Sequence, residues 1–126
     1  MIYTSYFSKV SALPNKLPNG FVAISIAGKS PSWYSGAKYR ILAPKYWFYA
    51  KYKEDGDSDY YTEQYYKEVL NNLNADRVVN DLYRLKKGIS GDIVLLCYES
   101  PSKFCHRHLV AEWLNKNGYE CEELKF

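Results

Sequence analysis

The chain has 126 residues, of which 47% are hydrophobic, and its 17 Lys/Arg against 14 Asp/Glu give a net charge of +3. This composition excludes a disordered chain, and the length predicts one α/β domain over residues 1–126 with a core of its own. No apolar run reaches the roughly 18 residues of a membrane span, and residues 1–7 lack the charged and apolar regions of a signal peptide. The three cysteines are an odd number without framework spacing. We therefore expect reduced thiols in a soluble, cytoplasmic protein.

The charge is unevenly distributed along the chain. Residues 1–53 contain eight Lys/Arg and no acidic residue, whereas residues 54–126 hold all 14 acids. The basic half also carries Trp33, Trp47 and several tyrosines. Such a mixture is typical of a surface that binds an anionic partner, with or without aromatic rings, either a small molecule or a nucleic acid. The alternative is that the two halves interleave in the fold and neutralise each other.

The first half of the chain predicts two strands and a helix. Residues 2–7 are β-branched and aromatic, and residues 21–27 are apolar enough for a strand that is buried on both faces. Turn residues, Leu13-Pro-Asn and Leu17-Pro-Asn-Gly, separate the two strands. Residues 28–31 form a loop rich in hydrogen-bond donors. Pro44 suits the first position of a helix that runs to about residue 53.

The second half predicts three helices and two strands. From about residue 59 to residue 73, apolar and tyrosine side chains recur at helical spacing. Asn74 caps the next helix, which ends before Gly88. Residues 93–98 are the clearest strand, and residues 103–117 are the clearest helix, with Ser102 as its N-cap and Gly118 after its end. Residues 119–124 return as a strand at the edge of the sheet.

Strands separated by helices predict a three-layer α/β sandwich, Rossmann-like, in which helices flank a mainly parallel central sheet. Ligands bind such sheets at the carboxyl ends of the strands. Two loops qualify by this topology, residues 28–33 after the second strand and residues 99–104 after the strand of residues 93–98. The second loop is followed by the sequence Cys105-His-Arg-His108.

The strand of residues 93–98 and the helix after it predict a catalytic centre. Side chains alternate along a strand, so Cys97 and Glu99 lie on one face. A helical projection of residues 103–117 points His106 inward, toward that strand end. We therefore predict Cys97, Glu99 and His106 as catalytic residues, with Glu99 holding the imidazole as a base or hydrogen-bond donor.

Residues from both loops predict a binding site for a phosphate-bearing ligand. Helix N-termini favour anions, so Lys103 and Arg107 can hold the phosphate, with the guanidinium bidentate. The helix dipole and Arg107 also favour the thiolate form of Cys105, which is a further ligand-binding candidate. From the neighbouring loop, the ligand-binding candidates are Lys29, Ser30 and the aromatic pair Trp33 and Tyr34, one of which stacks on a base or sugar.

Other interpretations of the same residues stay open. Cys97 and Cys105 could be ordinary core side chains, and a histidine on an apolar face is usually structural. A zinc site is disfavoured, because His106 and His108 are two residues apart on a helix and point to opposite sides. Cys105 and His106 likewise diverge on a helix, which makes Cys97 the better partner of His106. We predict no metal and no cofactor.

Several of these motifs resemble a known family, domain of unknown function 488. The matching segments are Ile24-Ser-Ile-Ala-Gly-Lys-Ser-Pro-Ser-Trp33, Leu42-Ala-Pro44, Leu95-Leu-Cys-Tyr-Glu-Ser-Pro101 and Phe104-Cys-His-Arg-His-Leu-Val-Ala-Glu-Trp-Leu114. The resemblance implies a compact α/β domain with its Cys-His-Arg cluster at a pocket, and it implies no particular reaction. Many members carry Asp-Val-Arg where this chain has Ser25-Ile-Ala27.

Three functional hypotheses follow. The first is an enzyme that acts on a nucleotide or nucleic acid, and the second is a protein that binds such a ligand without catalysis. The third is a regulatory or interaction domain, with an unidentified protein partner, in which the Cys-His-Arg cluster only packs the junction between strand and helix. No hypothesis involves a membrane.

Overall fold

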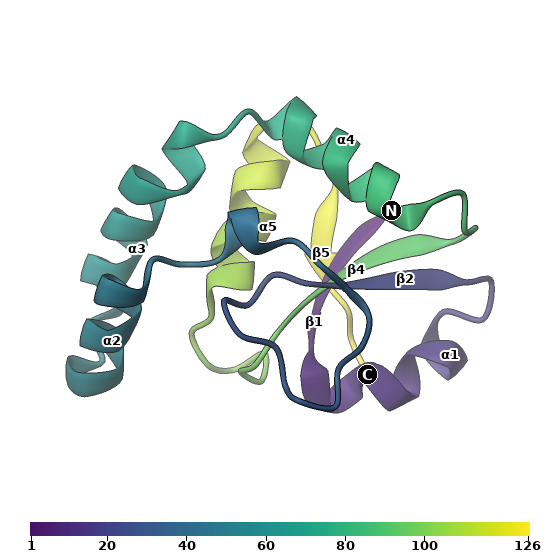
Figure 1. The fold of residues 1–126 in the computed structure, drawn as a ribbon, viewed down its shortest axis with the longest axis horizontal. Coiled ribbons are helices and arrows are strands. Elements are labelled where there is room, and N and C mark those ends of the chain that lie inside the picture. Colours follow the sequence, from purple (N-terminus) through teal and green to yellow (C-terminus); the bar gives the residue numbers. More distant parts are fainter.

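Five parallel strands form the centre of the molecule. The structure, a computed structural model, describes residues 1–126. The sheet has the order β3-β2-β4-β1-β5, and all four neighbouring pairs are parallel (Figure 1). The strands are β1 (Ile2–Tyr6), β2 (Phe21–Ser25), β3 (Ala37–Lys38), β4 (Asp92–Cys97) and β5 (Cys121–Glu123). The prediction of an α/β sandwich with a parallel sheet is confirmed.

Helices cover the two faces of the sheet unequally. The α-helices are α1 (Leu13–Lys16), α2 (Tyr46–Asp55), α3 (Ser58–Glu68), α4 (Ala75–Lys86) and α5 (His106–Lys116), and the short 3-10 helices are η1 (Phe7–Ala12), η2 (Arg40–Leu42) and η3 (Leu70–Asn72). The larger core joins one face of the sheet to α3, α4 and α5, and the smaller core packs the other face against η1, α1 and Tyr34. None of the helices combines the length and apolar composition needed to cross a membrane.

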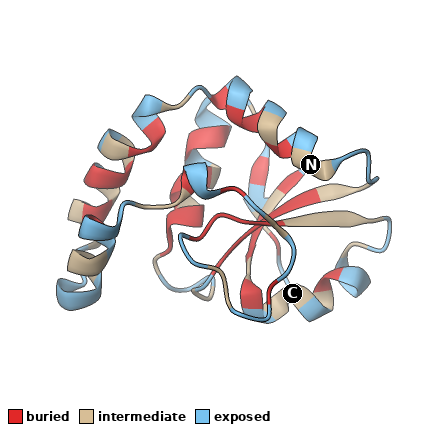
Figure 2. Ribbon diagram, in the orientation of Figure 1, coloured by how far each residue is buried: buried red, intermediate tan, exposed pale blue.

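Alternation along β4 divides its side chains between the two cores. Ile93, Leu95 and Cys97 belong to the larger core, whereas Val94 and Leu96 belong to the smaller one. All five side chains are almost completely buried, as Figure 2 shows for the centre of the sheet. The strand is therefore apolar throughout, as expected for a central parallel strand.

Several helix ends differ from the prediction by a few residues. The helix predicted from Pro44 begins at Tyr46, and the helix predicted to residue 73 ends at Glu68 and continues as the 3-10 helix η3. Asn74 caps α4 as predicted, since its Oδ1 accepts a hydrogen bond from the Arg77 backbone N–H at 3.0 Å.

The largest difference lies at the start of α5. That helix begins at His106, three residues later than predicted, because the segment before it forms a turn and Cys105 has an extended backbone (φ −153°, ψ 147°). Ser102 is therefore not the N-cap. Cys105 occupies that position, and its side chain does not follow the helix.

The register of the strands brings the candidate functional residues together at the carboxyl end of the sheet. Tyr6 at the end of β1 lies beside Cys97 at the end of β4, and Ser25 at the end of β2 lies beside Leu96. The N-terminus of α5 follows the loop after β4, so the first turn of this helix lies at the same end of the sheet (Figure 1). The edge strand β5 pairs with β1, as predicted for an edge, and brings Glu123 beside Thr4.

The amino end of the sheet depends on two glycines in close contact. Gly91 has φ +105°, and a Cβ placed on it would overlap the carbonyl group of Gly20. That carbonyl oxygen accepts the hydrogen bond from the Asp92 N–H that starts β4. Gly88 also has a positive φ, +76°, but has open space around it.

We expect Gly91→Ala to lower the free energy of unfolding by roughly 2–4 kcal/mol, because the methyl group adds a clash to an unfavourable φ. Gly88→Ala is the matched control and should cost only about 1 kcal/mol, the penalty of the backbone conformation alone. Urea unfolding of both variants measures the difference. Equal losses would show that the contact between residues 20 and 91 is unimportant.

Candidate functional site

Arg107 is the most completely buried charged side chain of the site. Its Nε and Nη2 donate to the two carboxylate oxygens of Glu123, each at 2.9 Å. Its Nη1 donates to the Glu99 carbonyl oxygen at 2.6 Å and contacts the sulfur of Cys97 at 3.4 Å. The guanidinium also lies 5.4 Å from the centre of the Tyr6 ring. The guanidinium therefore bridges the ends of β4, β1 and β5 within the protein.

Glu123 reaches the site because β5 pairs with β1. The hydroxyl of Thr4, on β1, donates to the same Glu123 oxygen that Arg107 contacts, at 2.7 Å. The Glu123 side chain is only 20% exposed. A buried guanidinium requires such a bidentate partner, because an unpaired charge in the interior is costly.

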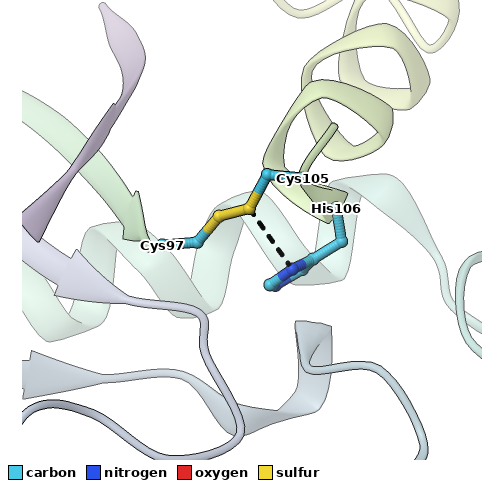
Figure 3. Close-up of side chains that lie close together, drawn as sticks. All are labelled: Cys97, Cys105 and His106. Atoms are coloured by element: carbon cyan, nitrogen blue, oxygen red, sulfur yellow. Dashed lines mark hydrogen bonds between the residues drawn. A yellow bond between two sulfur atoms is a disulfide. The ribbon is translucent and has the colours of Figure 1, made fainter. Parts of the chain in front are cut away.

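Two sulfurs and an imidazole meet at the carboxyl end of β4 (Figure 3). The structure joins Cys97 and Cys105 as a disulfide, and the Cys105 sulfur lies 3.9 Å from Nδ1 of His106. The three candidate ligand atoms all lie within 4.8 Å of one another, and the three residues are buried. The prediction that all thiols are reduced is wrong for this pair.

The expectation that Cys105 and His106 diverge is also wrong. It assumed that both residues lie on the helix, whereas the extended backbone of Cys105 turns its side chain toward Cys97. The third cysteine, Cys121, is free and buried in the larger core. Burial raises the pKa of its thiol to about 12, so this thiol is protonated at neutral pH.

His106 points inward, as predicted, but its partner is not Glu99. Its Nε2 lies 2.8 Å from the carbonyl oxygen of Ile26. A carbonyl oxygen only accepts, so Nε2 carries the proton and Nδ1 presents its lone pair to the Cys105 sulfur. Burial, reinforced by the positive charge of Arg107, lowers the pKa of His106 to about 4. The imidazole is neutral at pH 7.

Glu99 lies at the rim of the site. Its side chain is 36% exposed, and its carboxylate lies 3.7 Å from Nζ of Lys53, which comes from α2. Only its backbone carbonyl enters the cluster, through the hydrogen bond from Arg107. The residue lies two positions after Cys97, the last residue of β4, so the alternation of the strand no longer governs its side chain.

The loop after β2 touches the loop after β4. The hydroxyl of Tyr98 donates to the Lys29 carbonyl oxygen at 2.5 Å. The Ser30 hydroxyl lies 2.7 Å from that of Ser25, a completely buried residue at the end of β2. The two predicted ligand-binding loops are therefore adjacent, and the Lys29 side chain is exposed at their junction.

The two aromatic candidates in the loop after β2 have different environments. Tyr34 is buried, and its hydroxyl donates to the carbonyl oxygens of Ala23 and Ala37. Trp33 is 60% exposed and packs edge-on against Phe7 at 6.2 Å between ring centres. Of the two, only Trp33 offers a surface for stacking. Lys103, in the loop before α5, is exposed.

Sequence reasoning missed Lys53, Tyr98 and Glu123. We predicted Arg107 to bind a phosphate, and nothing in the local sequence selects Glu123 from its acidic neighbours as the partner of this guanidinium. An open pocket of about 710 Å³ was also missed. Tyr6, Lys9 and His108 line this pocket together with Glu123, so it lies against the same carboxylate that binds Arg107.

Comparison with protein families decides the classification. A family model described as the Active DUF488-N3 subclade matches residues 21–118, which is more than half of the chain. The chain belongs to the DUF488 family. The match covers β2 through α5, including Cys97, Cys105, His106 and Arg107, and confirms the resemblance of the sequence motifs. The same chain finds no match among curated proteins or solved structures.

The buried ion pair predicts a large difference between two neighbouring acids. Glu123→Ala leaves Arg107 charged and without its bidentate partner, and we expect a loss of about 3 kcal/mol or more in the free energy of unfolding. Glu122→Ala, on the exposed face of the same strand, should change it by less than about 0.5 kcal/mol. Denaturant unfolding provides the measurement, and similar losses in both variants would contradict this role of the ion pair.

His106 predicts a loss of stability in mild acid. The pKa is about 4 when folded against an ordinary 6.5, so between these values the unfolded chain binds a proton that the folded chain does not. Stability from this residue is therefore complete above about pH 6.5 and declines toward pH 4.

We expect the wild type to lose about 3 kcal/mol more than His106→Gln between pH 7 and pH 4. The pKa of His108 is also lowered, chiefly by burial, and because this histidine remains in the variant, the difference isolates His106. Chemical denaturation at both pH values gives the comparison. Parallel pH profiles would mean that His106 binds its proton equally in both states.

Proposed function

We propose that this DUF488 protein is a thiol-dependent enzyme that acts on a phosphate-bearing ligand, a nucleotide or nucleic acid, at the carboxyl ends of β2 and β4. One observation carries the proposal: the Cys105 sulfur lies 3.9 Å from the unprotonated Nδ1 of His106. A nucleophile next to a base that is oriented by a third group is the general arrangement of covalent catalysis. Here the third group is the carbonyl of Ile26.

The reaction begins from the reduced pair. A thiol reductant supplies two electrons and two protons, which convert the disulfide into two thiols. The Cys105 sulfur then forms a bond to an electrophilic carbon of the ligand while its proton passes to Nδ1 of His106, because an imidazole with a pKa of about 4 does not take the proton before the bond forms. The leaving group departs with the electrons of its bond and takes the proton from Nδ1. Water later releases the product and restores the thiol.

The other members of the cluster act on these two residues. Arg107 Nη1 contacts the sulfur of Cys97 at 3.4 Å, and a donor at this position favours the thiolate form of the sulfur. Cys97 is then the second thiol, and an oxidant such as a small-molecule disulfide, which takes up two electrons and two protons, closes the bond between Cys97 and Cys105. Glu99 and Lys53 pair at the rim, where they can contact the ligand. This differs from the prediction that Cys97 is the partner of His106.

The rim has the chemistry to bind a phosphate-bearing ligand. The side chains of Lys29 and Lys103 project from the two adjacent loops, and Lys53 lies beside Glu99. Trp33 is 60% exposed and Tyr98 is 49% exposed. Lysines attract phosphates, and exposed aromatic rings stack on bases.

A second candidate function rests on the burial of Arg107. A guanidinium that is fully occupied by Glu123 and a backbone carbonyl is the arrangement of a structural residue. In this interpretation, the cluster only joins β4 to α5, and the protein acts through its surface as a regulatory or interaction domain. The two candidates differ in whether changes to Cys105 and His106 affect turnover or only stability.

The test is a thermal-shift screen of the reduced protein with nucleotides, sugar phosphates and short DNA and RNA oligonucleotides, followed by chromatographic analysis of each stabilising ligand for turnover. We expect Cys105→Ser and His106→Gln to lower turnover by about 100-fold or more while ligand binding persists. Cys121→Ser, which removes the free core thiol, is the control and should retain turnover.

Binding is located by a second set of variants. Trp33→Ala and Lys29→Ala should weaken the ligand-induced shift, whereas Lys16→Ala, on α1, should not. Lys9→Ala tests whether the ligand binds instead in the open pocket beside Glu123. A screen without any stabilising ligand, or turnover that survives Cys105→Ser, would overturn the proposal in favour of the structural role.

A further inference from the structure

Three metal-binding side chains converge at the carboxyl end of β4. Cys97 contributes one sulfur from the strand, Cys105 contributes another from the residue before α5, and His106 contributes Nδ1 from the first turn (Figure 3). Their ligand atoms all lie within 4.8 Å of one another. Two thiolates and an imidazole are the ligands that Zn²⁺ prefers.

The surrounding hydrogen bonds hold these ligands in the orientation that a metal requires. Nε2 of His106 donates to the Ile26 carbonyl oxygen, which leaves the opposite nitrogen free to bind an ion. Metal-binding histidines are commonly oriented by such a backbone carbonyl. Arg107 Nη1 lies 3.4 Å from the Cys97 sulfur and can donate to it as a thiolate. Neither the Ile26 carbonyl nor the Arg107 guanidinium is itself one of the three ligands.

The backbone spacing of the two cysteines also suits an ion. Their Cα atoms are 7.2 Å apart, whereas most disulfides span about 4.4–6.8 Å between Cα atoms. Once reduced, the two sulfurs can separate to either side of an ion while the backbone of β4 and α5 stays in place.

The charges balance when an ion is present. Two thiolates neutralise a divalent cation, and the neighbouring guanidinium of Arg107 already has the Glu123 carboxylate as its partner. A buried site of this composition carries no net charge, which limits the cost of its burial. His108 lines the open pocket with Glu123 instead, so it is not needed as a ligand.

We propose that the reduced chain binds one Zn²⁺ ion through Cys97, Cys105 and His106. A phosphine or dithiol reductant first breaks the S–S bond with two electrons and two protons. The ion then displaces the two thiol protons, which go to the buffer, and forms two Zn–S bonds and one Zn–N bond. Three protein ligands leave the fourth position of a tetrahedron for water or a ligand.

This site goes beyond the proposed function and does not depend on it. The ion occupies the same sulfur that the proposed reaction uses as a nucleophile. Bound Zn²⁺ therefore protects Cys105 from alkylation and inhibits the thiol reaction. The two states of the cluster are an oxidised disulfide that excludes the ion and a reduced form that binds it.

The test uses the full-length chain, reduced with a phosphine, desalted without oxygen and titrated with Co²⁺ as a spectroscopic substitute for Zn²⁺. We expect a thiolate-to-cobalt charge-transfer band and the visible bands of tetrahedral cobalt, which saturate at one ion per chain and disappear when Zn²⁺ is added. Cys97→Ser, Cys105→Ser and His106→Gln should each weaken binding by at least about 10-fold. Cys121→Ser and His108→Gln are the matched controls and should bind normally.

A measurement on the wild type alone keeps the test independent of the folding of variants. Zn²⁺ should slow the reaction of iodoacetamide with Cys105 by at least about 10-fold, as read by mass spectrometry of the peptides, and the oxidised chain should show no cobalt bands. Absent bands in the reduced wild type, or bands lost in Cys121→Ser, overturn the metal site. Turnover measured with a chelator tests the proposed function separately, so the metal site and the proposed function can fail independently.

Discussion

The buried ion pair between Arg107 and Glu123 is the interaction on which the site depends. It joins the first turn of α5 to the edge strand β5, and the same guanidinium contacts the carbonyl of Glu99 and the sulfur of Cys97. A charge of this kind is tolerated in the interior only with a well-oriented partner. The pair therefore determines how α5 sits on the sheet and, through it, where Cys105 and His106 lie. The chemistry of the cluster is a consequence of this placement.

The parallel sheet explains why so many functional groups gather in so small a volume. The ends of β1, β4 and β2 lie side by side, and the connection after β4 returns at once as a helix whose first residue is His106. Backbone carbonyls that are not used in the sheet then become partners for side chains. The carbonyl oxygen of Ile26 accepts a hydrogen bond from His106, and that of Glu99 accepts one from Arg107. The site thus uses the irregular backbone at strand ends as part of its structure.

Local pattern predicted the fold and the position of the site, but not the partners within it. Alternation placed Cys97 on the face of β4 that meets α5, and helical projection pointed His106 toward it, because both depend only on neighbouring residues. The same two patterns predicted Glu99 as the partner of His106, yet the carbonyl of Ile26, 80 residues away, takes that place. The extended backbone of Cys105 was not predictable, since Ser102 has the better capping side chain. The pairing with Glu123 required knowledge that β5 lies beside β1, which no local pattern contains.

The order of the chain gives the ion pair a consequence for biosynthesis. Domains generally fold as units during synthesis. Glu123 follows every other residue of the cluster in the chain, so Arg107 acquires its carboxylate only after both cysteines and His106 have left the ribosome. Until then the guanidinium lacks the partner that allows its burial, and α5 cannot settle on the sheet. The packing of α5 against the sheet is therefore completed only when β5, the strand that carries Glu123, is in place.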